Sequence, residues 1–162
     1  MDAMKDADIP MLRHTLAALA YRAAKVLRGV PPGFAHFRAA ATTRTAGEIL
    51  AHMGDLFDWA VGSADGRTEW RELPPGPWER DVARFFAALK DFDDRLDSAV
   101  PLAVPAKKLF QGPVADALTH VGQLATLRRL AGAGIRGENY FKAEIKVGRV
   151  GMDQAPAVFE FD

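Results

Sequence analysis

The stretch "VARFFAALKDFDDRL" (residues 82–96) decides the expected fold, because its apolar side chains recur with the period of an α-helix. The apolar positions are separated by three, four, three and four residues, and they are Val82, Phe85, Leu89, Phe92 and Leu96. Such spacing draws one apolar stripe along a helix whose other faces are charged. Pro77 suits the first turn and "PLAVP" interrupts the pattern, so we predict a helix over about 77–98.

Two preceding segments have the same periodicity. The first covers about 10–28, where Asp8 is a candidate N-cap and "GVPPG" ends the pattern. The second covers about 45–61 and opens with "TAGE", in which Thr45 and Glu48 have the spacing of a capping box. Each segment is long enough for a helix that packs one face into a core.

A fourth helix is expected over about 113–131, where Pro113 suits the first turn and "LAGAG" ends the helix. No strand pattern interrupts these helices, and only "AEIKVGRVG" in the tail (135–162) resembles a short extended piece. We therefore predict an all-α fold, an up-down four-helix bundle with a long first connection and a C-terminal extension. With 162 residues, the chain is expected to form a single domain over 1–162.

The composition narrows the classes of partner. Lys plus Arg and Asp plus Glu each number 21, so no net positive field attracts nucleic acid or an anionic membrane. No apolar run has the length of a membrane span, and the N-terminus lacks the layout of a signal peptide, so we expect a cytoplasmic protein. Because the chain has no cysteine, a metal ion would need His, Asp or Glu ligands.

A polar line runs down the expected fourth helix, where Asp116, His120 and Gln123 are separated by four and three residues. Side chains at positions i and i+4 stand on successive turns and can close on one metal ion. His52, at the margin of the apolar stripe of the second helix, is the natural third ligand. Two imidazoles and one carboxylate would leave open positions on a divalent ion, and Gln123 could hydrogen-bond to a ligand or a bound water.

Plainer interpretations exist for the same residues. A histidine beside an apolar helix face is more often hydrogen-bonded than metal-bound, and Asp116 in a first helical turn would be favoured by the helix dipole. His14 is expected on a solvated helix face, and His36 lies in the long connection between the first two helices.

Three further residues are candidates for contact with a substrate. Trp59, which with Trp70 and Trp78 flanks the second interhelical connection, could also be a packing residue. Arg128 could bind an anion or simply complement the C-terminal end of its helix. Tyr140 could fold over the site or dock on the outside of the helices.

Two stretches resemble a known family. "TAGEILAHMGDLFDWA" (45–60) resembles the second-helix motif of the DinB/YfiT-like metalloenzyme superfamily, and "DALTHVGQLATLRRLAG" (116–132) resembles its fourth-helix motif. That family holds a divalent metal with three histidines. By position, His52 matches the first ligand and His120 the last, while Asp116 stands where the family usually has its middle histidine.

The resemblance implies a metal-dependent transferase that joins a low-molecular-weight thiol to an electrophilic small molecule, with Zn, Ni, Fe or Mn at the site. A homodimer is compatible with this expectation. Two alternatives stay open: a metal-free helical module for binding or dimerisation, in which the polar line is a satisfied buried network, and a metal-dependent hydrolase that uses bound water.

Overall fold

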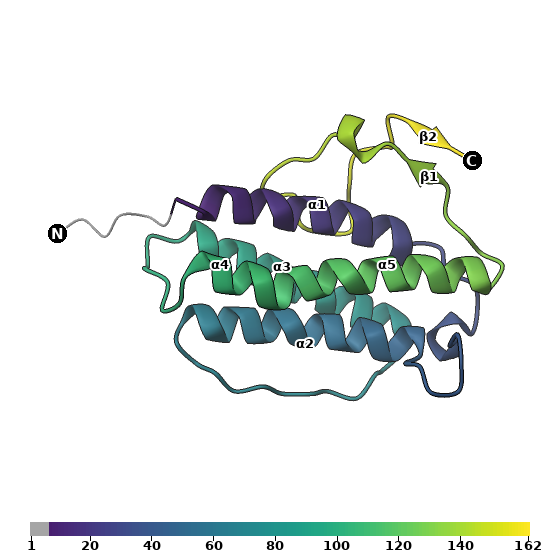
Figure 1. The fold of residues 1–162 in the computed structure, drawn as a ribbon, viewed down its shortest axis with the longest axis horizontal. Coiled ribbons are helices and arrows are strands. Elements are labelled where there is room, and N and C mark those ends of the chain that lie inside the picture. The colour runs from purple at the N-terminus through teal and green to yellow at the C-terminus, as the bar shows by residue number, and fades with distance from the viewer. Residues whose placement is uncertain (1–6) are drawn as a thin grey trace.

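The computed structural model describes residues 7–162, and these residues are mainly helical (Figure 1). The four long helices are α1 (Ile9–Leu27), α2 (Ala46–Ala64), α3 (Trp78–Asp97) and α5 (Ala115–Leu130). The shorter elements are η1 (Phe34–His36), α4 (Ala106–Leu109), the π-turn η2 (Phe110–Val114), β1 (Gly137–Glu138), η3 (Tyr140–Lys142) and β2 (Glu160–Phe161). The prediction of an all-α fold is confirmed, since the described residues add only one two-stranded sheet.

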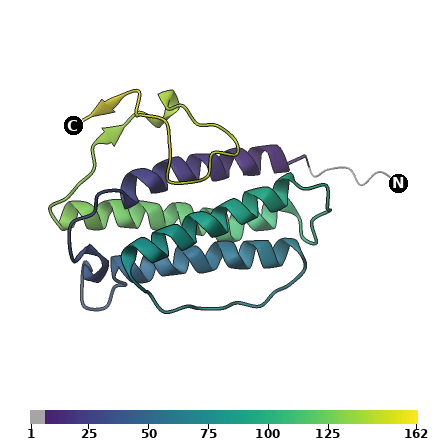
Figure 2. The ribbon, with the colours of Figure 1, turned by 180° about the vertical axis from the view of Figure 1, so that it is seen from behind.

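The long helices lie alongside one another and share one hydrophobic core (Figures 1 and 2). All five apolar positions of the stripe from Val82 to Leu96 are buried in this core. At its centre the ring of Phe57 on α2 lies 5.8 Å from that of Phe85 and 6.0 Å from that of Phe92, both on α3. In the part of the chain that the structure describes, no helix is both long and apolar enough to cross a lipid bilayer.

Both predicted N-cap residues stand at the start of their helices, but only one of them caps with its side chain. The capping box of α2 is confirmed: the Glu48 backbone N–H donates to Thr45 Oγ1 at 3.1 Å, and the Thr45 N–H donates to Glu48 Oε2 at 2.6 Å. Asp8 occupies the N-cap position of α1 as predicted, but its side chain makes no capping hydrogen bond. Asp8 has helical backbone angles, whereas a capping side chain needs an extended backbone to reach back to the first turn.

The continuous helical segment formed by α4, η2 and α5 begins before Pro113, the predicted start of the fourth helix. It starts at Ala106 and passes through the π-turn η2, which contains Pro113. A proline has no N–H and its ring crowds the carbonyl four residues before it, so a locally widened turn lets the helix continue. Asp116 therefore does not lie in the first turn of an isolated helix, and the helix-dipole explanation for this carboxylate loses its basis.

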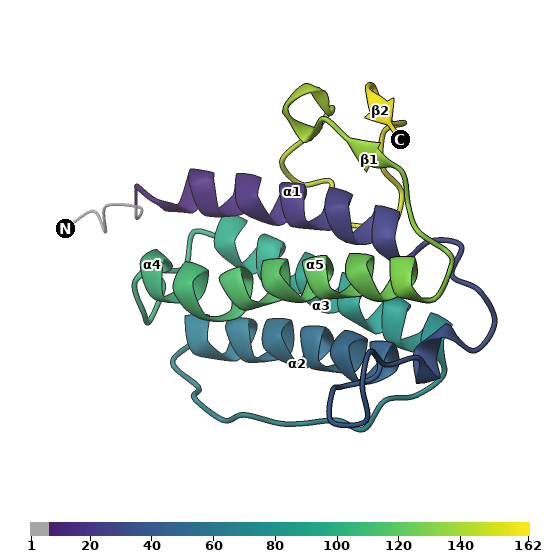
Figure 3. The same cartoon turned by 45° about the vertical axis from the view of Figure 1, so that its right-hand side comes forward.

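The C-terminal extension lies along α1. The loop between α2 and α3 lies along α2, on the opposite side of the helices (Figures 1 and 3). The extended piece expected in "AEIKVGRVG" pairs with no strand; instead β1 and β2 pair antiparallel, with Glu138 opposite Glu160. Lys25 Nζ on α1 lies 3.0 Å from Glu138 and 3.1 Å from Glu160. Burial alone would lower the pKa of Lys25, but the two carboxylates outweigh this effect and raise that pKa. These two ion pairs hold the C-terminal extension against α1.

Candidate metal centre

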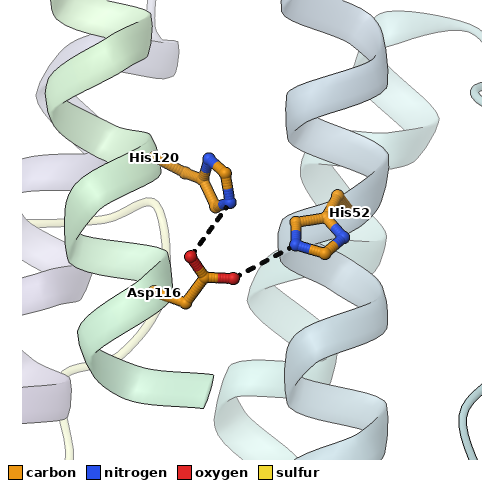
Figure 4. A group of neighbouring side chains, drawn as sticks. All are labelled: His52, Asp116 and His120. Carbon is orange, nitrogen blue, oxygen red and sulfur yellow. Dashed lines mark hydrogen bonds and ion pairs between the residues drawn. The ribbon is translucent and has the colours of Figure 1, made fainter. Parts of the chain in front are cut away.

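Three side chains from α2 and α5 converge in the groove between these helices (Figure 4). The two oxygens of Asp116 face different histidines: Oδ2 lies 3.2 Å from His52 Nε2, and Oδ1 lies 3.3 Å from His120 Nε2. One ligand atom from each residue lies within 4.8 Å of the other two. The His52, Asp116 and His120 group could therefore hold a metal ion, as their spacing in the sequence predicts.

The separations are close to those of a metal site. Bonds of about 2.0–2.2 Å to one ion place neighbouring ligand atoms roughly 3.0–3.6 Å apart, which matches both histidine–carboxylate distances. The imidazole rings of His52 and His120 stand edge to face with centroids 4.9 Å apart. Only small side-chain movements would be needed to bring all three ligand atoms to one ion.

The group is open on the side of its carboxylate. The Asp116 side chain is 45% exposed, whereas the side chains of His52 and His120 are 16% and 9% exposed. Helix α5 places Asp116 and His120 on successive turns, and α2 supplies His52 from across the groove (Figure 4). This arrangement leaves room for water or a substrate beside a bound ion.

Gln123 orients His120 as predicted. Its Oε1 lies 2.8 Å from His120 Nδ1. With this amide orientation the oxygen accepts, so in a neutral imidazole Nδ1 carries the ring proton and Nε2 presents a lone pair to Asp116. A lone pair and a carboxylate oxygen facing each other at 3.3 Å repel unless a cation or a proton lies between them. The pair of acceptors fits a metal ion, and a carbonyl behind the ligand is the usual support of a metal-bound histidine.

His52 has a different kind of support. Its Nδ1 is buried and has no hydrogen-bond partner in the described structure. The ring instead contacts the imidazole of His120 and the indole of Trp70, whose centroid is 5.5 Å away. Trp59 contacts Trp70 at 5.9 Å and so supports the site indirectly.

Buried carboxylates hold the loop that carries Trp70. The Leu73 N–H donates to Asp55 Oδ2 at 3.3 Å, and the Gly76 N–H donates to Asp81 Oδ2 at 2.7 Å. Asp55 also forms an ion pair with Arg84. Burial acts to lower the pKa of Arg84, but the carboxylates bonded to its guanidinium outweigh this effect and raise that pKa. This role of Asp55 was not predicted from the sequence, where its signal is a carboxylate inside the apolar part of the second helix.

Two predicted candidates lie away from the site. The buried Arg128 guanidinium donates to the carbonyls of Val26 at 2.9 Å and Gly29 at 3.2 Å, where α1 ends. Tyr140 lies against α1, with its ring 6.0 Å from that of Tyr21. Neither residue belongs to the His52, Asp116 and His120 group, so Arg128 serves the helix end and Tyr140 the docking of the tail.

The remaining histidines are exposed and separate from this group. His14 lies on α1 and His36 ends η1, and neither belongs to the cluster of potential ligands.

Comparison with known proteins gives no match to a family model, a curated protein or a solved structure.

Proposed function

We propose that this chain is a divalent-metal-dependent enzyme on an up-down four-helix bundle of the DinB type. The observation that carries the proposal is the convergence of His52, Asp116 and His120, which come from two helices. His52 and Asp116 are 64 residues apart in the sequence. A carboxylate shared between two imidazoles from different helices matches a mononuclear site with open positions. The oxygen and nitrogen donors suit Zn, Ni, Fe(II) or Mn(II).

The reaction that we propose is transfer of a low-molecular-weight thiol to an electrophilic small molecule. A bound divalent ion would supply a Lewis acid at which the thiol loses its proton near neutral pH. The sulfur forms a bond to the electrophilic carbon while the bond from that carbon to its leaving group breaks. The leaving group departs with the bonding electrons, and the thiol proton goes to solvent. The chain has no cysteine, so the sulfur comes from the cosubstrate.

The residues around the ligands prepare the site for this chemistry. Gln123 holds one tautomer of His120, and Trp70 packs on His52 so that the ring stays directed at the groove. Asp116 lies on the exposed side, where the two reactants would enter. A fixed ligand set costs little reorganisation when the metal and substrate bind.

Metal stoichiometry tests the ligand set. Protein without a polyhistidine tag is incubated separately with zinc, nickel, manganese and ferrous ions, dialysed, and analysed for metal content. We expect one ion per chain in the wild type, and none in His52→Ala or His120→Ala. His14→Ala removes an exposed histidine and should retain the ion. A wild-type protein that binds none of these ions would overturn the proposal.

Activity is then tested with glutathione, cysteamine or dithiothreitol as the thiol and monochlorobimane as the electrophile. We expect the rate of thioether formation to depend on the restored metal and to fall to the uncatalysed rate in His120→Ala. Loading of the metal without acceleration for any thiol would contradict the transferase assignment. Metal-dependent hydrolysis of an activated ester by the same samples would favour the hydrolase instead.

A metal-free binding module is the second candidate, and one observation favours it. Asp116 lies within hydrogen-bond distance of His52 Nε2, so a protonated Nε2 can donate to the carboxylate without an ion. A rotated Gln123 amide would then donate to His120 Nδ1 and free His120 Nε2 to donate to the second Asp116 oxygen. The metal analysis decides between this satisfied network and the metalloenzyme.

A further inference from the structure

A hollow of about 670 Å³ lies along the groove between α2 and α5 and meets the metal-binding group at His120. One wall is formed by α5 from Thr119 to Leu130, and the other by Ile49 of α2 and by the connection before α2. His120 and its partner Gln123 both line the hollow. A space of this size holds a small organic molecule.

The walls of the hollow are mainly apolar. Ile49 and Leu127 form buried surface, while Leu130 is 59% exposed at the far end. The hydroxyls of the three threonines that line it already donate to backbone carbonyls: Thr43 to Ala40 at 2.9 Å, and Thr119 and Thr126 each to the carbonyl four residues earlier, both at 3.1 Å. Because each hydroxyl already uses its single proton, it can only accept a further hydrogen bond and cannot donate one to an anion.

Arg44 is the cation in this lining, and the lining contains no Asp or Glu. Within residues 7–162 its guanidinium makes no hydrogen bond or ion pair, whereas Arg38 on the same connection donates to the Ala41 carbonyl at 3.2 Å. The pKa of Glu48 is lowered mainly by the Thr45 backbone and more weakly by Arg38 and Arg44, but Glu48 does not line the hollow. Arg44 is therefore available to an anion that enters from solution.

We propose, resting on the metal-dependent function above, that this hollow binds the organic substrate and that the substrate is an elongated organic anion. Its apolar body would lie against Leu127 and Leu130, and its anionic group would pair with Arg44. Helix α2 rises roughly 9 Å from Ala46 to His52, and Arg44 lies two residues before this helix begins. The anionic group and the reacting atom are thus separated by several bonds, which excludes acids as short as acetate.

Binding of octanoate to the metal-free protein tests this assignment. Removing the ion with a chelator ensures that the carboxylate cannot bind at a metal. We expect octanoate to shift the backbone amide resonances of residues 43–49 and 119–130. Octanol, which has the same chain without the charge, should bind about fivefold more weakly, the value of one exposed ion pair. Octylamine, protonated at neutral pH, should bind more weakly still because Arg44 repels it.

Matched arginine variants identify the cation. Arg44→Gln should weaken octanoate binding to the level of octanol and leave octanol binding unchanged. Arg38→Gln removes the same charge from the same connection and should leave both affinities unchanged. Leu130→Ser should weaken both ligands, because it removes exposed apolar surface. Equal octanoate affinity in Arg44→Gln and the wild type, or resonance shifts confined to other residues, would overturn the proposal.

Zinc content measured on separate portions of the same preparations distinguishes the two proposals. If zinc binds at one per chain while octanoate does not bind, the hollow is not the substrate site and the metal centre still stands. If octanoate binding depends on Arg44 while no metal binds, the metal-dependent function fails, and with it the assignment of the anion as the substrate of a metal enzyme.

Discussion

His52 Nε2 and Asp116 Oδ2 lie 3.2 Å apart, although 64 residues separate them in the chain. Asp116 therefore connects α2 to α5. A carboxylate at this position keeps the distance to both imidazoles near that required by one ion. The nature of this single side chain is thus the most informative feature to change.

Replacing Asp116 separates geometry from charge. Asp116→Asn keeps the size of the side chain but removes its anionic ligand atom, so we expect zinc affinity to fall at least about tenfold. Asp116→His should bind zinc more tightly than Asp116→Asn, because it supplies a third imidazole on the same turn. Competition with a zinc chelator measures both affinities. Identical zinc affinity in the wild type and Asp116→Asn would show that the carboxylate is not a ligand.

Gln123→Ala removes the acceptor behind His120. We expect a loss of about tenfold or more in zinc affinity with little change in the unfolding temperature, because Gln123 is exposed and orients a ligand rather than filling the core. Gln123→Glu retains an acceptor at the same reach and should keep most of the affinity. If alanine and glutamate variants bind zinc equally, His120 does not need this support.

Trp70 provides a local optical signal for the site. Its ring lies 5.5 Å from His52, so a paramagnetic ion such as Cu(II) held by His52 should quench its fluorescence. Trp70→Phe should lose most of this quenching. Trp78→Phe is the matched control, since Trp78 packs against Phe34, 5.5 Å away. Quenching that persists in Trp70→Phe but disappears in Trp78→Phe would place the ion elsewhere.

Much of this site can be predicted from the sequence because its signals are local. Thr45 and Glu48 are three residues apart and form their capping box, and the four-residue spacing of Asp116 and His120 sets them on successive turns of one helix. The helix period also places His52 at the edge of a buried face. These features depend on backbone geometry that a short segment determines by itself.

Other features depend on how distant segments pack. Pro113 is an ordinary signal for a helix start, yet here it lies inside a π-turn, because tertiary packing favours continuing the helix from Ala106. The contact of Trp70 with His52 requires the path of a loop that Asp55 holds from within the core. No spacing in the sequence encodes where such a loop passes along α2.

Arg128 shows the same limit and gives a stability prediction. Its position near the end of the predicted fourth helix suggested anion binding or a favourable contact with the C-terminal end of that helix. Instead its guanidinium donates to carbonyls at the end of α1, and burial lowers its pKa. Arg128→Ala should lower the free energy of unfolding by about 2–4 kcal/mol, because it leaves buried carbonyls without donors. Arg128→Lys should recover only part, since an ammonium cannot reproduce the fork of donors. Urea denaturation measures both, and a loss below about 0.5 kcal/mol in the alanine variant would contradict this role.

The Asp65–Arg95 pair predicts a dependence of stability on pH. The hydrogen bond from Arg95 holds the Asp65 pKa below its ordinary value of 3.8, and Arg67 acts in the same direction more weakly. A carboxyl whose pKa is depressed in the folded state stabilises that state above its unfolded pKa, and this contribution is lost as pH falls through the folded pKa. The Asp65 side chain is 32% exposed, so the effect is modest, about 0.5 kcal/mol.

Asp65→Asn should therefore be less stable than the wild type at pH 7, and the difference should shrink toward zero below pH 3.8. Urea denaturation of both proteins across this range measures it, and a difference that stays constant or grows as pH falls would show that Asp65 does not act through its charge.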